Sequence, residues 1–363
     1  MATFEESRFT AFRQRAKPEE VMAEDSIIWN QEGLALATFL GFEERTVSLL
    51  RKVADWGKSF RAVHIFTYAH SVGSSRSAYE EELFTLARKV SKDVRTVTFD
   101  RDWAAIQRKM SEIDCDILVF DFTSVANRFL FGLLNVVSSI AAKVILACSE
   151  ARSYWPTKTD ISRLRSCTDP KNYEAAANDY PWLYGVDYVA EAIDMFEGIH
   201  SPGYDCFFYG FMPFKSVRLG TVISEVDNAF WIAIVGEPRT GKLRWRQKAL
   251  RELNTRYVAR ACEEVSIPTF GYLNTVDYFQ DQFFGSPRRL RQNIVIATLG
   301  SKLQNLGVWS IASLVPSVKL ITSVPTRYFD NAFSSGTGLT WLIDVIEPMR
   351  RTREARPDFD FDR

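Results

Sequence analysis

The residues best suited to bind a charged ligand follow an apolar strand in the first half of the chain. Residues 121–128 read DFTSVANR, where Thr123, Ser124, Asn127 and Arg128 offer hydroxyl, amide and guanidinium donors. In open parallel sheets, ligands bind outside the carboxyl ends of the strands. We therefore predict a binding turn here. The alternative is that the hydroxyl groups only cap the following helix.

A matching turn occurs in the second half of the chain. Residues 298–304 read TLGSKLQ and carry Ser301, Lys302 and Gln304. Each turn lies within a similar stretch, residues 117–154 and 293–328, and each stretch reads as an apolar strand, a polar turn, an amphipathic helix and a second apolar strand. This repeat predicts an internal duplication with one ligand site between the halves.

A third motif is GEPRTGK at residues 236–242, which matches the spacing GxxxxGK after a strand and before a helix. A phosphate-binding loop uses such glycines, and the next residue is a Ser or Thr that holds magnesium. Here that residue is Leu243. Three interpretations stay open for the segment that begins at Gly236: an ATPase or GTPase loop, a magnesium-free anion contact by Arg239, Lys242 and the helix N-terminus, or a plain turn.

Two shorter motifs are weaker. Residues 41–46 read GFEERT, in which Gly41 ends a strand and Arg45 could reach an anion, whereas the two glutamates favour a plain helix N-terminus. Residues 334–338 read SSGTG, in which Gly336 forms part of a glycine-rich loop or of a simple turn.

Composition narrows the function classes. The 363 residues include 45 basic and 45 acidic side chains, so no global attraction to nucleic acid or anionic lipid is expected. Two basic runs remain, 239–246 and 288–291, and the second of them leaves nucleic acid as a secondary partner. Five scattered cysteines without a CxxC pair favour reduced thiols and a cytoplasmic location. We expect no membrane span, no metal and no certain cofactor.

Apolar strands alternate with helical patterns along most of the chain, which predicts an α/β protein of two Rossmann-like parallel-sheet units. The strand at 230–236 is interpreted as the counterpart of the strand at 34–41, and a helix is expected at 188–198. The expected organisation is an N-terminal extension (1–30), a first unit (31–150), an irregular connection (151–203), a second unit (204–346) and a charged, frayed tail (347–363).

Two halves of this kind, with a strand that closes in Asp121-Phe-Thr123 and a cation shortly after, resemble the CARF and SAVED sensor domains of prokaryotic antiviral systems. Those Rossmann-like domains bind cyclic oligonucleotides. The resemblance implies that residues 41–46 form the first ligand-contacting turn and residues 121–128 the second. The second half departs from the pattern at Ala297-Thr-Leu, although Lys302 keeps a cation there. The resemblance to these sensor domains also implies that any effector is a separate polypeptide.

Three functions follow as hypotheses. The preferred one is a non-enzymatic sensor or regulatory subunit that binds a small nucleotide-like ligand between the halves, with an effector polypeptide or a second copy as partner. The first alternative is a nucleotide- or nucleoside-processing enzyme that uses Asp121, Thr123, Glu43 or His70 as acid–base groups. The second alternative is a scaffold subunit of a larger complex.

Overall fold

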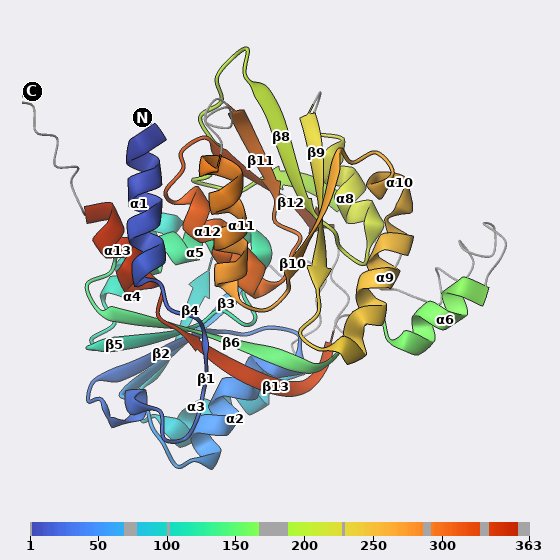
Figure 1. The fold of residues 1–363 in the computed structure, drawn as a ribbon. Helices are drawn as coiled ribbons and strands as arrows, with labels where there is room; N and C mark the ends of the chain where they lie inside the picture. Colours follow the sequence, from blue (N-terminus) through green and yellow to red (C-terminus); the bar gives the residue numbers. More distant parts are fainter. Residues whose placement is uncertain are drawn as a thin grey trace, which may run out of the picture.

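The chain forms two β-sheets flanked by helices, which confirms the predicted α/β fold class (Figure 1). The structure is a computed structural model, and it describes residues 2–68, 78–99, 102–166, 188–226, 229–285, 292–326 and 334–354. Predictions that fall on other residues, including His70 and the basic run 288–291, lie outside the described residues.

The first sheet has seven strands in the order β1-β13-β6-β5-β2-β3-β4. The central strand β2 is a continuous apolar run with all its residues buried, as expected for a parallel strand covered on both faces. The strands are β1 (Glu20–Val21), β2 (Leu34–Phe39), β3 (Ala62–Tyr68), β4 (Val94–Phe99), β5 (Ile117–Asp121), β6 (Lys143–Tyr154) and β13 (Ser334–Ile343).

The second sheet has six strands in the order β10-β9-β8-β11-β12-β7. They are β7 (Tyr188–Ala192), β8 (Asp205–Phe211), β9 (Ala229–Glu237), β10 (Glu263–Pro268), β11 (Gln292–Ala297) and β12 (Val318–Pro325). Strand β7 occupies the segment where the sequence analysis expected a helix. It pairs antiparallel with β12, so residues 188–192 form a strand because their backbone hydrogen bonds go to the sheet.

The two sheets repeat one topology. In each, five parallel strands follow the Rossmann order 3-2-1-4-5, and an antiparallel strand flanks the fifth. The predicted repeat therefore corresponds to β5-α5-β6 and β11-α12-β12. The sequence analysis matched the strand at 230–236, which is β9, to β2. In the structure the counterpart of β2 is β8, and β9 is the counterpart of β3. Both β8 and β9 are apolar, so composition alone did not distinguish them.

Helices cover both faces of each sheet, and α5, α11 and α12 lie between the sheets in Figure 1. The first half contains α1 (Ala2–Arg15), η1 (Ile27–Asn30), η2 (Glu44–Val47), α2 (Ser48–Asp55), α3 (Glu80–Val90), α4 (Trp103–Ser111), α5 (Asn127–Ser139) and α6 (Lys158–Ser166). The second contains α8 (Ser216–Ile223), η3 (Gly241–Leu243), α9 (Arg244–Leu253), α10 (Thr255–Val258), α11 (Tyr272–Phe284), α12 (Lys302–Ala312) and α13 (Ile346–Glu354).

The end of the chain returns to the first sheet. Strand β13 follows the second unit in sequence, yet it pairs antiparallel with β6, and β1 pairs with β13 in turn. Residues 334–343, which the sequence analysis placed in the second unit, therefore lie in the first sheet. The partners are separated by about 190 residues, from Ser149 to Thr340, so no local pattern indicates this pairing.

Both terminal segments pack against the body of the protein. The side chains of Phe9 and Phe12 on α1 are fully buried, and α1 contacts both α11 and α13. Met349 on α13 is also fully buried, so the segment from 347 to 354 is a packed helix instead of a frayed tail. Among the described segments, every helix is too short or too polar to span a bilayer.

Candidate functional site between the two halves

The two polar turns predicted from the repeat meet in the structure. The Lys302 ammonium at the start of α12 donates to the backbone carbonyl of Val125 and to Asn127 Oδ1, the latter at 3.0 Å. Asn127 Nδ2 in turn donates to the Thr298 carbonyl at 3.3 Å. The carboxyl ends of β5 and β11 are thus joined directly, as the duplication led us to expect.

The other polar residues of the second turn have a structural role. Ser301 is the N-cap of α12, and its hydroxyl accepts from the Gln304 backbone N–H while the Gln304 side chain accepts from the Ser301 N–H. This reciprocal pair is a capping box, which satisfies two otherwise unpaired donors of the first helical turn. For Ser301 and Gln304, capping is the role that the structure displays.

Lys302 is held by neutral acceptors alone among the described residues. Burial, and after it the nearby positive charge of Arg45, lower the pKa of its ammonium to about 7. A cation without a carboxylate at hydrogen-bond distance is costly to bury, and an incoming anion removes part of that cost. Lys302 is therefore the best anion-binding group of the junction.

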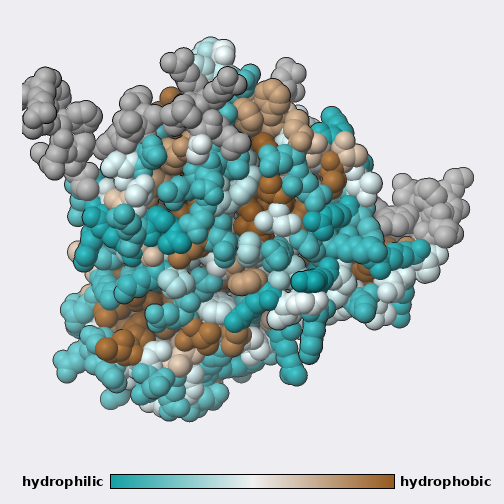
Figure 2. Space-filling model, in the orientation of Figure 1, coloured by the Kyte–Doolittle hydropathy of each residue, from teal (hydrophilic) through white to brown (hydrophobic). Residues whose placement is uncertain are grey.

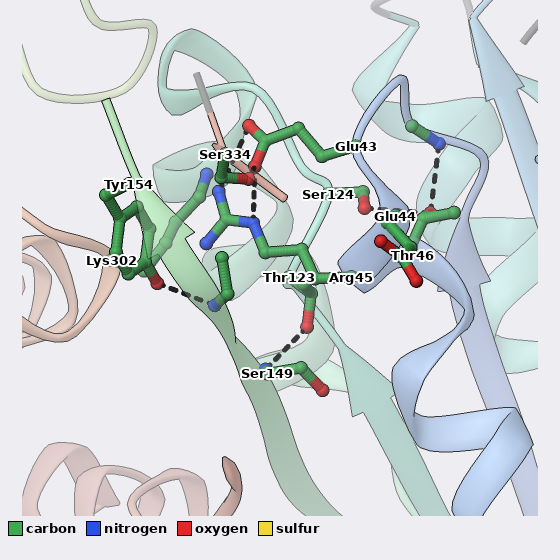
Figure 3. A network of polar contacts seen from close by, with 12 residues as sticks. Glu43, Glu44, Arg45, Thr46, Thr123, Ser124, Ser149, Tyr154, Lys302 and Ser334 are labelled. Atoms are coloured by element: carbon green, nitrogen blue, oxygen red, sulfur yellow. Dashed lines mark hydrogen bonds and ion pairs between the residues drawn. The ribbon is translucent and has the colours of Figure 1, made fainter. Parts of the chain in front are cut away.

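Arg45 lies on the other side of the same junction, as Figure 3 shows. Its Nε donates to Glu43 Oε2 at 2.7 Å, and the Ser334 hydroxyl donates to the same carboxylate. Burial acts to raise the pKa of Glu43, but Arg45, Ser334 and Lys302 together hold that pKa below its usual value. Glu43 stays ionised and neutralises the charge of Arg45. While this ion pair is intact, Arg45 attracts a further anion only weakly.

The turn at 41–46 packs against the turn at 121–128. Thr46 Oγ1 accepts from the Gly41 N–H at 3.1 Å and from the Ser124 hydroxyl at 2.8 Å. A Cβ on Gly41 would lie 2.5 Å from Ser124 Cβ, so this close approach requires glycine. Gly41 and Ser124 hold the two turns together, and their polar groups are already hydrogen-bonded.

Thr123 anchors the floor of the site. Its hydroxyl and its backbone N–H both donate to Asp121 Oδ1, and the hydroxyl accepts from the Ser149 N–H at 2.8 Å. Thr38 donates to the other oxygen of the carboxylate at 3.3 Å. Burial raises the pKa of Asp121 to about 6 in spite of these hydrogen bonds. Asp121 and Thr123 thus brace the ends of β2, β5 and β6.

The groups that could perform covalent chemistry near the site are restrained. Cys148 on β6 is buried, and burial raises the pKa of its thiol to about 12, so the nucleophilic thiolate does not form near neutral pH. His64 lies in the buried part of β3, where burial lowers its pKa. Among the described residues, no group of His, Cys, Asp or Glu side chains is placed to hold a metal ion.

Arg128 stays close to the junction on the first turn of α5. Its guanidinium lies 4.4 Å from the centre of the Phe129 ring. Its Nε is buried and has no hydrogen-bond partner. The Nε of Arg128 therefore has unused hydrogen-bonding capacity, one residue after Asn127, which accepts from Lys302.

The GxxxxGK segment is not arranged as a phosphate loop. Gly236 lies inside β9, paired with Ile267 of β10, so it does not supply the tight turn that such a loop needs. Lys242 is exposed on η3. Arg239 instead turns towards the first sheet, where its guanidinium lies 4.7 Å from the centre of the Trp341 ring on β13.

Strand β13 brings to the site residues that sequence reasoning did not find. Gly336 belongs to this strand, has a positive φ of 69° and donates its N–H to Glu44 at 2.8 Å. Ser334 contacts Glu43, and Trp341 Nε1 donates to Glu150 at 3.0 Å. The sequence offered a signal only for Gly336, because the rest depends on the pairing of β13 with β6.

The junction is filled by its own side chains. The contact of Lys302 with the 121–128 turn occupies the space between the halves. Beside it, on the side of the first half, Ser334 contacts Glu43 (Figure 3). A groove of about 470 Å³ lies elsewhere, between α8 and α10, and its lining includes none of the predicted site residues. A ligand at the junction would therefore replace existing protein contacts.

Comparisons with known proteins show no family for this chain. No family model matches this chain, and no curated protein matches it. The chain is similar to a solved universal stress protein structure from Pseudomonas aeruginosa, with 10% identity and a TM-score of 0.23, covering 89% of this chain and 98% of that one. At this identity and TM-score, the likeness supports no argument about function.

Proposed function

We propose that this protein is a sensor or regulatory subunit that binds a small phosphate-bearing ligand of the nucleotide type at the junction of its two halves. The observation that carries the proposal is Lys302: a buried ammonium beside Arg45, held only by Val125 and Asn127 acceptors among the described residues. A phosphate oxygen is a stronger acceptor for such a cation than a neutral carbonyl or amide.

A phosphate at the junction would replace a contact that joins the halves, because Lys302 links α12 of the second half to the β5–α5 turn of the first. Glu43 links the 41–46 turn to β13 through Ser334, and this contact lies within the first half. An anion that attracts Lys302 would weaken the link between the halves, and by competing with Glu43 for Arg45 it would loosen the first half's side of the junction. Ligand binding would then change the angle between the halves, which a partner surface could read. We propose an effector polypeptide or a second copy of this chain as that partner.

The resemblance to CARF and SAVED domains supports the choice of first probes. Cyclic dinucleotides and cyclic oligoadenylates carry phosphodiesters, aromatic bases and a size suited to a contact with both halves. A role in antiviral defence follows only if one of these binds. We also expect no turnover of the ligand. The thiol of Cys148 is buried and stays protonated, and the carboxylate of Asp121 already accepts a hydrogen bond from Thr123.

The test compares Lys302→Met with Lys109→Met, a matched change at an exposed lysine of α4. We expect one of the probes to bind the wild-type protein and the Lys109 variant equally in calorimetry. Lys302→Met is expected to bind about 10- to 100-fold more weakly, because a hydrogen bond to a charged group contributes about 1.5–3 kcal/mol. Adding Arg128→Ala to Lys302→Met should abolish measurable binding.

Thermal unfolding of each variant without ligand shows whether the fold is intact. Equal affinity of wild type and Lys302→Met would refute the junction as the binding site. Conversion of the probe to a product on incubation would show an enzyme instead of a sensor.

A further inference from the structure

A strongly basic surface is formed by two segments that lie far apart in the sequence. Residues 152–166 contain four basic and one acidic side chain, and residues 237–253 contain six basic and two acidic side chains. Together they carry ten basic against three acidic groups, although the whole chain is balanced at 45 of each. Such a local excess in a neutral protein requires compensation elsewhere on the surface and points to a partner of opposite charge.

The two segments form one continuous surface. Helix α6 packs on α9 through Ile161, Leu164 and Ala249, and Arg165 forms an ion pair with Glu252 at 2.8 Å. Arg246 of α9 donates to the carbonyl of Pro156 at 2.7 Å. These contacts hold the end of β6, α6 and the start of α9 side by side, as in Figure 1.

The basic groups on this surface are available. Two of the three acidic side chains are engaged, because Glu252 pairs with Arg165 and Asp160 accepts from the Thr157 hydroxyl at 2.6 Å. Hydrophilic side chains dominate the surface over α6 and the start of α9 in Figure 2. Six exposed cations form no side-chain hydrogen bond or ion pair with any described residue: Arg152, Lys158, Arg163, Lys242, Arg244 and Lys248.

We propose that this α6–α9 surface binds the sugar-phosphate backbone of nucleic acid. Phosphates neutralised by Lys and Arg release condensed counterions, which drives sequence-independent binding. Arg244 and Lys248 lie one helical turn apart on one face of α9, so they can contact neighbouring phosphates.

A nucleic acid fits this surface better than an acidic protein does. Protein interfaces are centred on buried apolar and aromatic anchors. Over the described residues of the two segments, Tyr154 and Leu243 are the large apolar side chains that are substantially exposed. With little apolar area to bury, the affinity must come from charge, which suits a polyanion. This proposal does not depend on the small-ligand site, because the six exposed cations are different residues from Lys302 and Arg45.

The experiment measures fluorescence anisotropy of a labelled 25-nucleotide single strand and a 25-base-pair duplex over a series of salt concentrations. The variant is Arg163→Ala/Arg244→Ala/Lys248→Ala. Its matched control is Lys89→Ala/Lys92→Ala/Lys109→Ala, which removes three exposed cations from the α3–α4 side of the first half. All six substitutions are at exposed positions, so both variants should fold.

We expect wild type and control to bind in the micromolar range at low salt, and the surface variant to bind at least tenfold more weakly. The slope of log affinity against log salt should fall by about 2–3, since each lost phosphate contact removes about 0.7–0.9. Absence of binding by wild type, or equal weakening in both triple variants, would overturn the proposal. Equally tight competition by polyglutamate would assign the surface to an acidic protein and would also overturn it.

Discussion

Replacing Phe12 by Ala is expected to lower the free energy of unfolding by about 3–5 kcal/mol, the range for truncation of a fully buried phenylalanine. Phe12 has no exposed surface, although it lies on a helix at the very start of the described chain. The Phe12→Ala variant should therefore unfold at a much lower urea concentration than the wild-type protein. Urea denaturation followed by tryptophan fluorescence and by circular dichroism measures the change.

The effect is large because the N-terminal segment ties the two halves together. Phe9 on α1 packs 5.5 Å from Phe284 of α11 in the second half, ring centre to ring centre. Arg13 Nη2 donates to Asp277 of the same helix at 3.0 Å. A few residues later, β1 pairs with β13 of the first sheet. Loss of the Phe12 ring thus leaves a cavity where both halves share one core.

The matched control is Phe230→Ala. Phe230 is 47% exposed on β9, so its truncation should cost far less than that of Phe12. Equal losses at the two positions would show that α1 does not contribute to the shared core. Separate unfolding transitions in the Phe12 variant would show in addition that the halves have become independent.

The affinity of the junction for a phosphodiester ligand is expected to fall as pH rises above about 7. Burial and then Arg45 lower the pKa of Lys302 to about 7, so the free protein loses this positive charge near neutrality. A bound anion favours the protonated form. Between the pKa of the free protein and that of the complex, affinity should drop by up to tenfold per pH unit. Calorimetry from pH 6 to 9 tests this, and a phosphodiester probe does not itself titrate in that range.

The same group affects stability with a defined sign. The folded pKa of Lys302 lies below its ordinary value of 10.5, so between about 7 and 10.5 the unfolded chain binds a proton that the native protein does not. The stability of the wild-type protein relative to Lys302→Met should therefore rise with pH across this window and remain constant below it. A flat difference, or an affinity independent of pH, would show that Lys302 titrates as an ordinary exposed lysine.

Much of the candidate site was predictable because it lies in the repeated units. The donors at residues 121–128 and Lys302 follow apolar strands, and parallel strands place their carboxyl ends at one edge of a sheet. The polar turns, the cations and the repeated pattern of strand, turn, helix and strand are therefore readable from local patterns. The same patterns could not separate ligand contacts from capping, which is why Ser301 and Gln304 were included with Lys302.

The amino-acid sequence by itself determined the α/β class, the duplication and the turns that carry the polar groups, because hydrophobic periodicity and strand-end chemistry are local properties. Only the tertiary structure decided that β13 returns to pair with β6, that α1 ties the halves together, and that Glu43 neutralises Arg45 while Lys302 meets no carboxylate among the described residues. These features depend on contacts between residues more than 100 positions apart or on the shape of a turn. Their energy comes from burial and pairing that no short window of sequence contains.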